Sequence, residues 1–152
     1  MPVDMEPYTN ILVAVDYSDH VHTVLARAVA MAQRHAAGLH LVHVVDYMPP
    51  MVLGDEPFPV TVWPVDDEKL LDLAREQMRK LTATLSEVSY TDHVIMGSPV
   101  KEICRLASEL GVALIIAGSH GRRGFARLLG STAGALVHET PCDLLLVKMQ
   151  AE

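Results

Sequence analysis

Short apolar runs alternate along this chain with longer stretches in which apolar residues recur every three or four positions. The runs have few polar interruptions, which is typical of strands covered on both faces, as in a parallel sheet. The pattern predicts five strands, the third weaker than the others, over residues 11–15, 39–45, 90–96, 112–117 and 143–148.

Between these runs, apolar residues at helical spacing predict four helices. The stripe of the first helix is Val21, Val24, Leu25, Ala28 and Ala32, and that of the second is Leu70, Ala74, Met78, Leu81 and Leu85. The third carries Ile103, Cys104, Ala107 and Leu110 and ends at Gly111, and a short fourth helix is expected from Ser131 to about His138.

Polar residues and glycines beside the stripes predict where the helices begin and end. Residues 16–19, Asp-Tyr-Ser-Asp, offer cap residues for the first helix, which is expected to run to about Ala37 with Gly38 as its stop. Ser98 is expected to cap the third helix and Ser131 the fourth, because serine oxygens accept hydrogen bonds from first-turn amides.

Strands and helices therefore alternate along the chain, which is typical of an α/β protein. Right-handed crossovers then build a parallel sheet with helices on both faces. We predict a three-layer α/β/α fold with a five-stranded parallel sheet in the order 3-2-1-4-5. A chain of 152 residues suits one domain, covering 1–152.

Residues 47–65 interrupt this pattern. The segment holds five of the nine prolines and the single Trp63, so no regular element is expected to run far through it. A loop of this length in a compact domain is a lid, a binding segment, or surface chain without a defined structure. The sequence leaves these alternatives open.

The composition narrows the function. A formal net charge of −7 argues against a general nucleic-acid binder, which needs positive charge to displace counterions from phosphates. Cys104 and Cys142 lack the Cys-x-x-Cys spacing of zinc or redox sites. The acidic start, 1–6, lacks the basic region of a signal peptide, and no apolar run approaches membrane-spanning length. We expect a cytoplasmic protein with no membrane partner.

Glycines and arginines gather after the fourth predicted strand, in residues 118–132. Glycines allow a ligand to approach the backbone closely, and successive amides can then form a concavity for an anion. The helix expected after Gly130 adds unpaired amides and the positive end of its dipole. The segment therefore fits a phosphate cradle, although an ordinary strand-to-helix connector with solvated arginines has the same composition.

Asp16 and Gly118 end the first and fourth predicted strands. In the order 3-2-1-4-5, these two strands are neighbours at the point where the strand order reverses, and ligands bind beyond the carboxyl ends of strands at such points. A carboxylate that can accept from ribose hydroxyls then faces the glycine segment. Val44, near the end of the second strand, offers an apolar edge for a base.

A more specific signal comes from six short stretches that are spread over almost the whole chain: 11–18, 41–46, 97–99, 118–121, 129–132 and 141–147. They read Ile-Leu-Val-Ala-Val-Asp-Tyr-Ser, Leu-Val-His-Val-Val-Asp, Gly-Ser-Pro, Gly-Ser-His-Gly, Leu-Gly-Ser-Thr and Pro-Cys-Asp-Leu-Leu-Leu-Val. In this order they resemble the motifs of the universal stress protein family.

The resemblance implies an adenine nucleotide alpha hydrolase-like fold, a stress-response role and a homodimer formed through the last strand, 143–148. It implies ATP or AMP as the ligand, with or without Mg²⁺. The nucleotide-binding positions of the family fall on Ala14, Val15, Asp16, Val44, Ala117, Gly118, His120, Gly121, Arg122, Gly124, Gly130, Ser131 and Thr132. The alternative is a nucleotide-free dimeric interaction module of the same family.

One departure from the family pattern concerns loop length. The ATP-binding members have nine residues between the second glycine and the Gly-Ser or Gly-Thr pair, whereas eight residues, 122–129, separate Gly121 from Gly130 here. The choice between ATP and AMP therefore stays open. No Walker Lys-Ser or Lys-Thr pair follows the glycines, so we expect no enzyme and at most slow ATP hydrolysis.

Other candidates for chemistry are weaker. Asp16 fits a ribose contact better than a metal site, because a single carboxylate is a poor metal site without partners. The pairs His20 with His22 and His40 with His43 do not converge on their predicted elements, so we expect surface or packing roles. Tyr17 has no role that the sequence defines.

Overall fold

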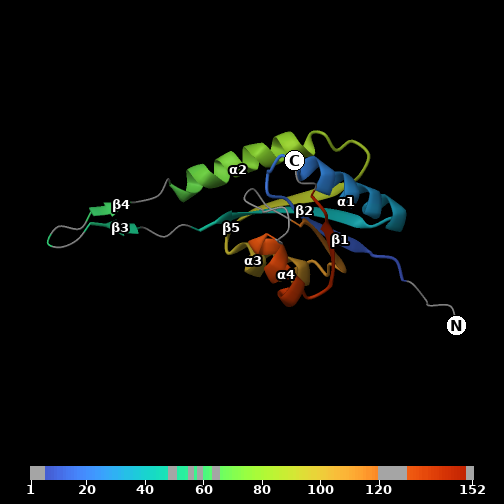
Figure 1. Cartoon of the computed structure of the whole chain (residues 1–152). Coiled ribbons are helices and arrows are strands. Elements are labelled where there is room, and N and C mark those ends of the chain that lie inside the picture. Colours follow the sequence, from blue (N-terminus) through green and yellow to red (C-terminus); the bar gives the residue numbers. More distant parts are fainter. Residues whose placement is uncertain are drawn as a thin grey trace.

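The computed structural model describes residues 6–47, 51–54, 57, 60–62, 66–119 and 130–149. Seven strands and four helices lie in these ranges, and Figure 1 shows their arrangement. The strands are β1 (Asn10–Ala14), β2 (Gly38–Asp46), β3 (Met51–Leu53), β4 (Val60–Val62), β5 (Tyr90–Gly97), β6 (Leu114–Gly118) and β7 (Asp143–Val147). The helices are α1 (Val21–His35), α2 (Asp67–Thr82), α3 (Pro99–Glu109) and α4 (Ser131–Glu139).

Five strands form one sheet in the order β5-β2-β1-β6-β7, and every neighbouring pair is parallel. Numbered along the sheet-forming strands, this is the predicted order 3-2-1-4-5, which is confirmed. The chain moves outward from β1 in one direction through β2 and β5, and in the other through β6 and β7. The strand order therefore reverses between β1 and β6.

Two hydrophobic cores lie on opposite faces of this sheet. Alternate residues of a strand point to opposite faces, so Ile11 and Val13 of β1 join the core under α1 and α2, whereas Leu12 joins the core under α3 and α4. Figure 1 shows the first pair of helices above the sheet and the second pair below it. Both faces are covered, which explains why the strands appear as continuous apolar runs.

The end of the first helix lies two residues before the predicted position of about Ala37, and the predicted stop at Gly38 was wrong. α1 ends at His35, and Ala36 takes the left-handed conformation with φ of 50°. Gly38 instead opens β2, where a Cβ would lie only 2.9 Å from Asn10 Oδ1. The glycine is therefore used for close approach of two strands and not to end the helix.

The predicted caps also differ from the structure. The N-cap of α1 is His20, which makes no side-chain cap hydrogen bond, although residues 16–19 include two aspartates and a serine. Ser98 is the N-cap of α3 as predicted, but its side chain makes no cap hydrogen bond. Gly130, and not Ser131, is the N-cap of α4, so Ser131 is the first helical residue.

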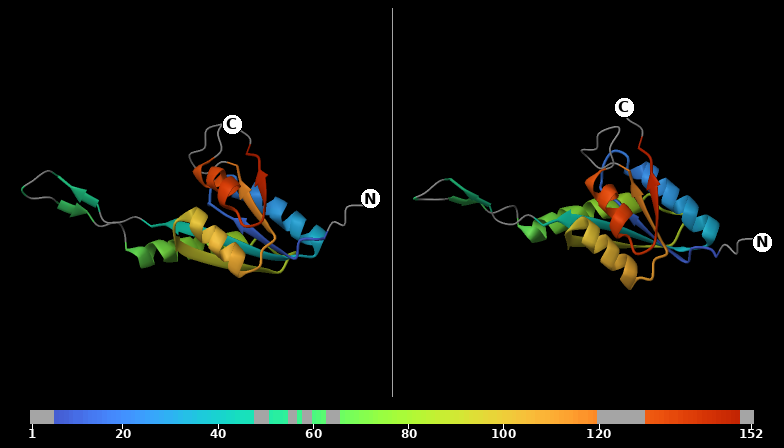
Figure 2. Two further views of the ribbon diagram at one scale, coloured as in Figure 1. Left: turned by 90° about the horizontal axis from the view of Figure 1, so that it is seen from below. Right: turned by 60° about the horizontal axis from the view of Figure 1, so that its bottom comes forward.

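The proline-rich segment contains a short hairpin. β3 and β4 pair antiparallel, with Met51 opposite Val62. Figures 1 and 2 show this hairpin standing away from the five-stranded sheet in all three views. The prediction that no regular element runs far through 47–65 agrees with strands of three residues, although the hairpin itself was not predicted.

Among the described helices, none is both long enough and apolar enough to span a bilayer.

Candidate functional site

The carboxyl ends of β1 and β6 lie side by side at the point where the strand order reverses. Val13 pairs with Ile116 near these ends, so the residues that follow each strand emerge at the same edge of the sheet. Ligands bind at this position in α/β sheets. The segments that follow the two strands run in opposite directions there and leave a crevice between them.

Ala14, Val15 and Asp16 follow one another at the end of β1. Ala14 packs with the core under α3 and α4, whereas Val15 is buried in the core under α1 and α2. Val15 is fully engaged through its main chain, since its amide donates to Val42 O at 2.9 Å and its carbonyl lies 2.7 Å from His43 Nδ1. Asp16 is the first exposed residue after the strand.

Val44 lies on β2, on the same face of the sheet as Ala14, and packs with the same core. It is partly buried, two residues before the end of β2 at Asp46. Ala14 and Val44 thus place apolar surface on the α3 and α4 side of the carboxyl edge. This agrees with the predicted apolar contact for a base, although the contact itself remains a prediction.

The carboxylate of Asp16 is held in a local turn. Asp16 Oδ1 accepts a hydrogen bond from the amide of Ser18 at 3.0 Å. Tyr17, between them, has a left-handed backbone with φ of 56°. A positive φ is uncommon for a residue other than glycine, asparagine or aspartate, so this turn has an unusual conformation at the candidate site.

The sequence did not predict the tertiary contacts of Tyr17. Its hydroxyl donates to Ala74 O of α2 at 2.8 Å, and its ring centroid lies 4.1 Å from that of His43. The Val15 carbonyl can only accept, so His43 Nδ1 carries the proton in that contact. Burial raises the pKa of Tyr17, and the Asp92 carboxylate adds to the rise. No sequence signal reveals this role beyond the position of Tyr17 next to Asp16.

Ser119 holds together the two ends of the glycine segment. Its carbonyl accepts from the amide of Gly130 at 2.8 Å, and its amide donates to Val147 O at 2.9 Å. Its hydroxyl oxygen accepts from the amide of Met149 at 3.1 Å. The start of α4 is therefore fixed beside the end of β6. The predicted residues His120, Gly121, Arg122 and Gly124 lie outside the described part of the chain.

The first turn of α4 lies at this edge. Ala117 and Gly118 end β6, and Gly130 precedes α4, with Ser131 exposed and Thr132 partly buried in its first turn. The first amides of a helix have no partner within the helix, and the helix dipole places partial positive charge there. An anion at this edge would find main-chain donors.

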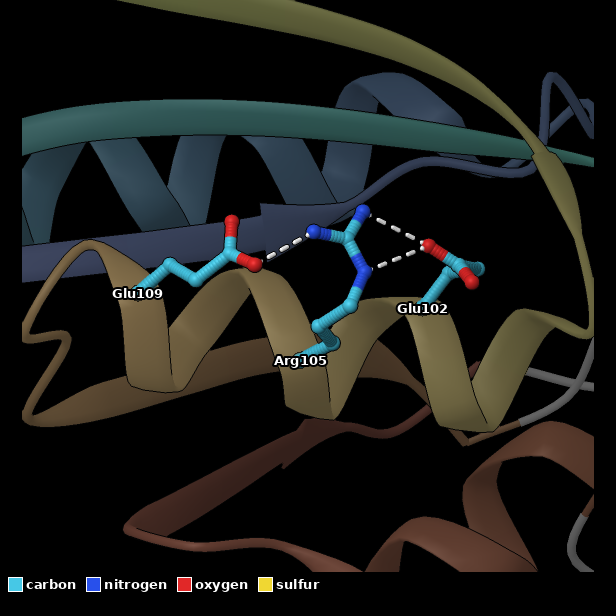
Figure 3. Close-up of polar contacts among 3 residues, drawn as sticks. All are labelled: Glu102, Arg105 and Glu109. Atoms are coloured by element: carbon cyan, nitrogen blue, oxygen red, sulfur yellow. Dashed lines mark hydrogen bonds and ion pairs between the residues drawn. The ribbon is translucent and has the colours of Figure 1, made fainter.

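Three arginines of the described helices pair with carboxylates of their own helix. Arg105 donates to Glu102 Oε2 at 2.9 Å and 2.7 Å through two nitrogens and to Glu109 Oε1 at 2.6 Å through a third (Figure 3). On α2, Arg75 and Arg79 are likewise paired with carboxylates of the same helix. Each of these arginines thus has a carboxylate partner on its own helix, whereas the arginines of the glycine segment lie outside the described residues.

The histidines of the described chain do not form a metal centre. His40 contacts Thr91 and lies 6.0 Å from the ring of His93, whereas His43 contacts Val15 and Tyr17. Within the described residues, no group of three histidine, cysteine, aspartate or glutamate side chains is close enough to hold a metal ion.

The sequence of this chain is similar to those of a known protein family. Residues 7–148 match the model of the "Universal stress protein family". The chain is 33% identical over 143 residues to universal stress protein A homolog 1 of Coxiella burnetii, an alignment that covers 94% of this chain and 98% of that protein.

The fold of this chain is also similar to those of solved structures. The structure of the universal stress protein MJ0577 of Methanocaldococcus jannaschii has a TM-score of 0.74 at 25% identity and covers 96% of this chain and 99% of its own. A universal stress protein solved in complex with cAMP has a TM-score of 0.65 at 20% identity and covers 93% of this chain and 97% of its own. The second likeness shows the fold alone.

Proposed function

This chain belongs to the universal stress protein family, and from that premise we propose that it binds ATP or AMP at the carboxyl ends of β1 and β6. In this proposal the protein is a regulatory or sensor module of a stress response. It responds to the nucleotide by binding it and does not consume it. The proposal extends to a cytoplasmic location, which cell fractionation tests.

One observation carries the proposal. The hydrogen bond from the Gly130 amide to the Ser119 carbonyl holds the start of α4 next to the end of β6, and the exposed Asp16 follows the neighbouring strand. Anion donors and a carboxylate acceptor therefore lie at the same edge of the sheet. An adenosine phosphate needs both, because its phosphates are acceptors and its ribose hydroxyls can donate.

The proposed roles follow from where the residues lie. Asp16 accepts from the ribose hydroxyls, and Ala14 and Val44 contact the base. Main-chain amides near Gly118 and in the first turn of α4 bind the phosphates. The full proposed set consists of Ala14, Val15, Asp16, Val44, Ala117, Gly118, His120, Gly121, Arg122, Gly124, Gly130, Ser131 and Thr132.

A universal stress protein solved in complex with cAMP supports an adenine nucleotide as the ligand, because this chain belongs to the same family. Mg²⁺ enters the proposal only with the phosphates of ATP, since Asp16 alone makes a poor site for the metal. We propose no catalytic role. Phosphate release that increases with time under excess Mg-ATP would contradict that part of the proposal.

Mass spectrometry of small molecules released from freshly purified, denatured protein tests the proposal directly. We expect an adenylate. Addition of ATP or AMP at 100 times its Kd is expected to stabilise the protein by about 2.7 kcal/mol, which for a chain of this size raises Tm by roughly 5–10 °C.

Variants locate the site in the same assay. Asp16→Ala and Gly118→Val are expected to abolish the nucleotide-dependent rise in Tm, because the first removes the ribose acceptor and the second obstructs the approach to the backbone. Asp19→Ala is the matched control, since Asp19 is an exposed acid in the same loop. Equal responses in all three variants would contradict the proposed site.

A homodimer through β7 belongs to the same proposal. β7 is an edge strand of the sheet, and Leu144, Leu145 and Leu146 are each only partly buried within the chain. An apolar edge of this kind is stabilised by pairing with an identical strand. Sedimentation at micromolar concentration is expected to show a dimer, and a monomer would contradict it.

The same edge supports the second candidate, a dimeric interaction module that binds no nucleotide. In that case the purified protein contains no adenylate, and Tm is equal with and without millimolar ATP, while the dimer persists. The two candidates therefore differ in the nucleotide assays and agree in the sedimentation assay.

A further inference from the structure

Tyr17 has a backbone conformation that its residue type does not favour. Its φ is 56°, directly after Asp16 and at the carboxyl edge of the sheet. Strained residues of this kind persist only where the surrounding structure holds them, and they gather at functional sites. The contacts of Tyr17 show what holds it.

Three elements hold the Tyr17 side chain. Its hydroxyl donates to the carbonyl of Ala74 in the middle of α2, at 2.8 Å. Its ring lies on His43 of β2 with the centroids 4.1 Å apart, and His43 in turn contacts the carbonyl of Val15 after β1. The ring is partly buried against the core under α1 and α2. Helix, sheet and loop are thus joined through one side chain.

The conformation of Tyr17 determines the geometry of the Asp16 turn. The hydrogen bond from the Ser18 amide to Asp16 Oδ1 spans Tyr17, so the φ of Tyr17 sets where that amide lies relative to the carboxylate. Without the hydroxyl and ring contacts, the residue would relax toward negative φ and the turn would open. The carboxylate of Asp16 would then sample several orientations.

We propose that Tyr17 is a positioning residue, which holds the carboxylate of Asp16 in place for the ribose of the nucleotide and ties that carboxylate to α2. The nucleotide in this inference rests on the proposed function. The support that Tyr17 gives to the Asp16 turn does not depend on that function. Tyr17 is not itself proposed to contact the nucleotide. Its effect on binding therefore passes through Asp16.

Tyr17→Phe is the variant that isolates the hydroxyl, because it keeps the ring on His43 and removes the bond to Ala74. Tyr8→Phe is the matched control: Tyr8 also donates through its hydroxyl, to Asp143 Oδ2 at 2.9 Å, but at the start of β7. Both variants lose one tyrosine hydrogen bond. Only Tyr17→Phe is expected to affect the candidate site.

The first measurement needs no ligand. Backbone ¹⁵N relaxation of the free protein is expected to give order parameters near 0.85 for Asp16 and Ser18 in the wild type and in Tyr8→Phe. In Tyr17→Phe they are expected to fall toward 0.6, the range of flexible backbone. Unchanged order parameters in Tyr17→Phe would overturn the inference.

The second measurement is a double-mutant cycle on ATP and AMP affinity. Tyr17→Phe is expected to weaken binding by about 5–10-fold in the wild-type background and by less than about 2-fold in Asp16→Asn, where no carboxylate remains to be positioned. A merely structural role would lower Tm equally in both backgrounds and leave Kd unchanged. An unchanged Kd in Tyr17→Phe would therefore overturn the inference.

Failure of the proposed function gives a different pattern. If the wild type bound neither ATP nor AMP, the proposed function would fail, and the relaxation data would still decide whether Tyr17 holds the Asp16 turn. If the wild type bound nucleotide and Tyr17→Phe bound it equally well, the proposed function would stand and the positioning role would fall.

Discussion

Tyr17 and Ala36 lie on either side of α1 and share a left-handed backbone, with φ of 56° and 50°. The contacts that hold them are different. Tyr17 is held through its side chain by residues far away in the sequence, Ala74 and His43. Ala36 is held by its own helix, since its amide donates to Gln33 O and the next amide, of Ala37, donates to Ala32 O.

Gly111 has the same left-handed backbone as Ala36. It follows α3 with φ of 63°, and the neighbouring Val112 amide donates to Ala107 O as the Ala37 amide does to Ala32 O. Ala36 and Gly111 therefore end two helices in the same way, one with alanine and one with the residue that this conformation favours. At a helix end, the strain of a left-handed residue can be removed by glycine. At Tyr17 it is retained, because the side chain is needed.

The largest effect is expected from Tyr17→Ala. This variant loses both the ring contacts and the hydrogen bond to Ala74, which together hold the left-handed backbone. We expect the free energy of unfolding to fall by about 2–3 kcal/mol, less than for a fully buried aromatic residue because Tyr17 is only partly buried. Urea denaturation measures it, and a loss below about 1 kcal/mol would show that the side chain does not hold the turn.

Gly111→Ala is expected to have the next largest effect. A Cβ at this position would have no atom within 4 Å, so only the backbone conformation opposes the change. The left-handed conformation costs a residue with a Cβ about 1–2 kcal/mol, and we expect the free energy of unfolding to fall by about 1 kcal/mol. A loss above about 2 kcal/mol would indicate a clash that the structure does not show.

Ala36→Gly is the reverse experiment on the same motif. Glycine removes the unfavourable left-handed alanine but gains freedom in the unfolded chain, so a net stabilisation of about 0.5–1 kcal/mol is expected. Tyr17→Gly relieves the same backbone strain and is nevertheless expected to destabilise. If both glycine variants were stabilising, the contrast between local and tertiary support would be wrong.

The smallest effect is expected from alkaline pH. The pKa of Tyr17 is raised above its ordinary value of 10.0 by burial and by Asp92, so the folded state holds the hydroxyl proton more tightly than the unfolded state. The stability that this contributes is present below pH 10 and is lost as pH rises further.

Tyr17→Phe is therefore expected to lose less stability than the wild type between pH 9 and pH 11. The difference should be about 0.5 kcal/mol, because partial exposure to solvent weakens the effect. Tyr8→Phe tests the same linkage at a second tyrosine, since the pKa of Tyr8 is also raised, by its hydrogen bond to Asp143. Equal alkaline loss in the wild type and Tyr17→Phe would mean that Tyr17 ionises as freely in the folded state as in the unfolded state.

The sheet could be predicted because buried parallel strands carry a direct sequence signal. Runs such as 11–15 and 112–117 are apolar on both faces, and their order follows from crossover rules and the resemblance to a known family. For the same reason Asp16 and Gly118 could be placed together, since Asp16 follows β1 and Gly118 ends the neighbouring β6. The roles of Gly38 and Ser131 were assigned wrongly, because glycine and serine suit both a helix boundary and the residue next to it.

The sequence alone determined the alternation of strands and helices and the parallel sheet that they build. These features depend on hydrophobic periodicity, which is a local property of the chain. Only the tertiary structure decided how the Asp16 turn is held, because Ala74 and His43 reach Tyr17 from elements 57 and 26 positions away in sequence. Contacts at such separations depend on side chains meeting in the folded protein, and no pattern near Tyr17 records them.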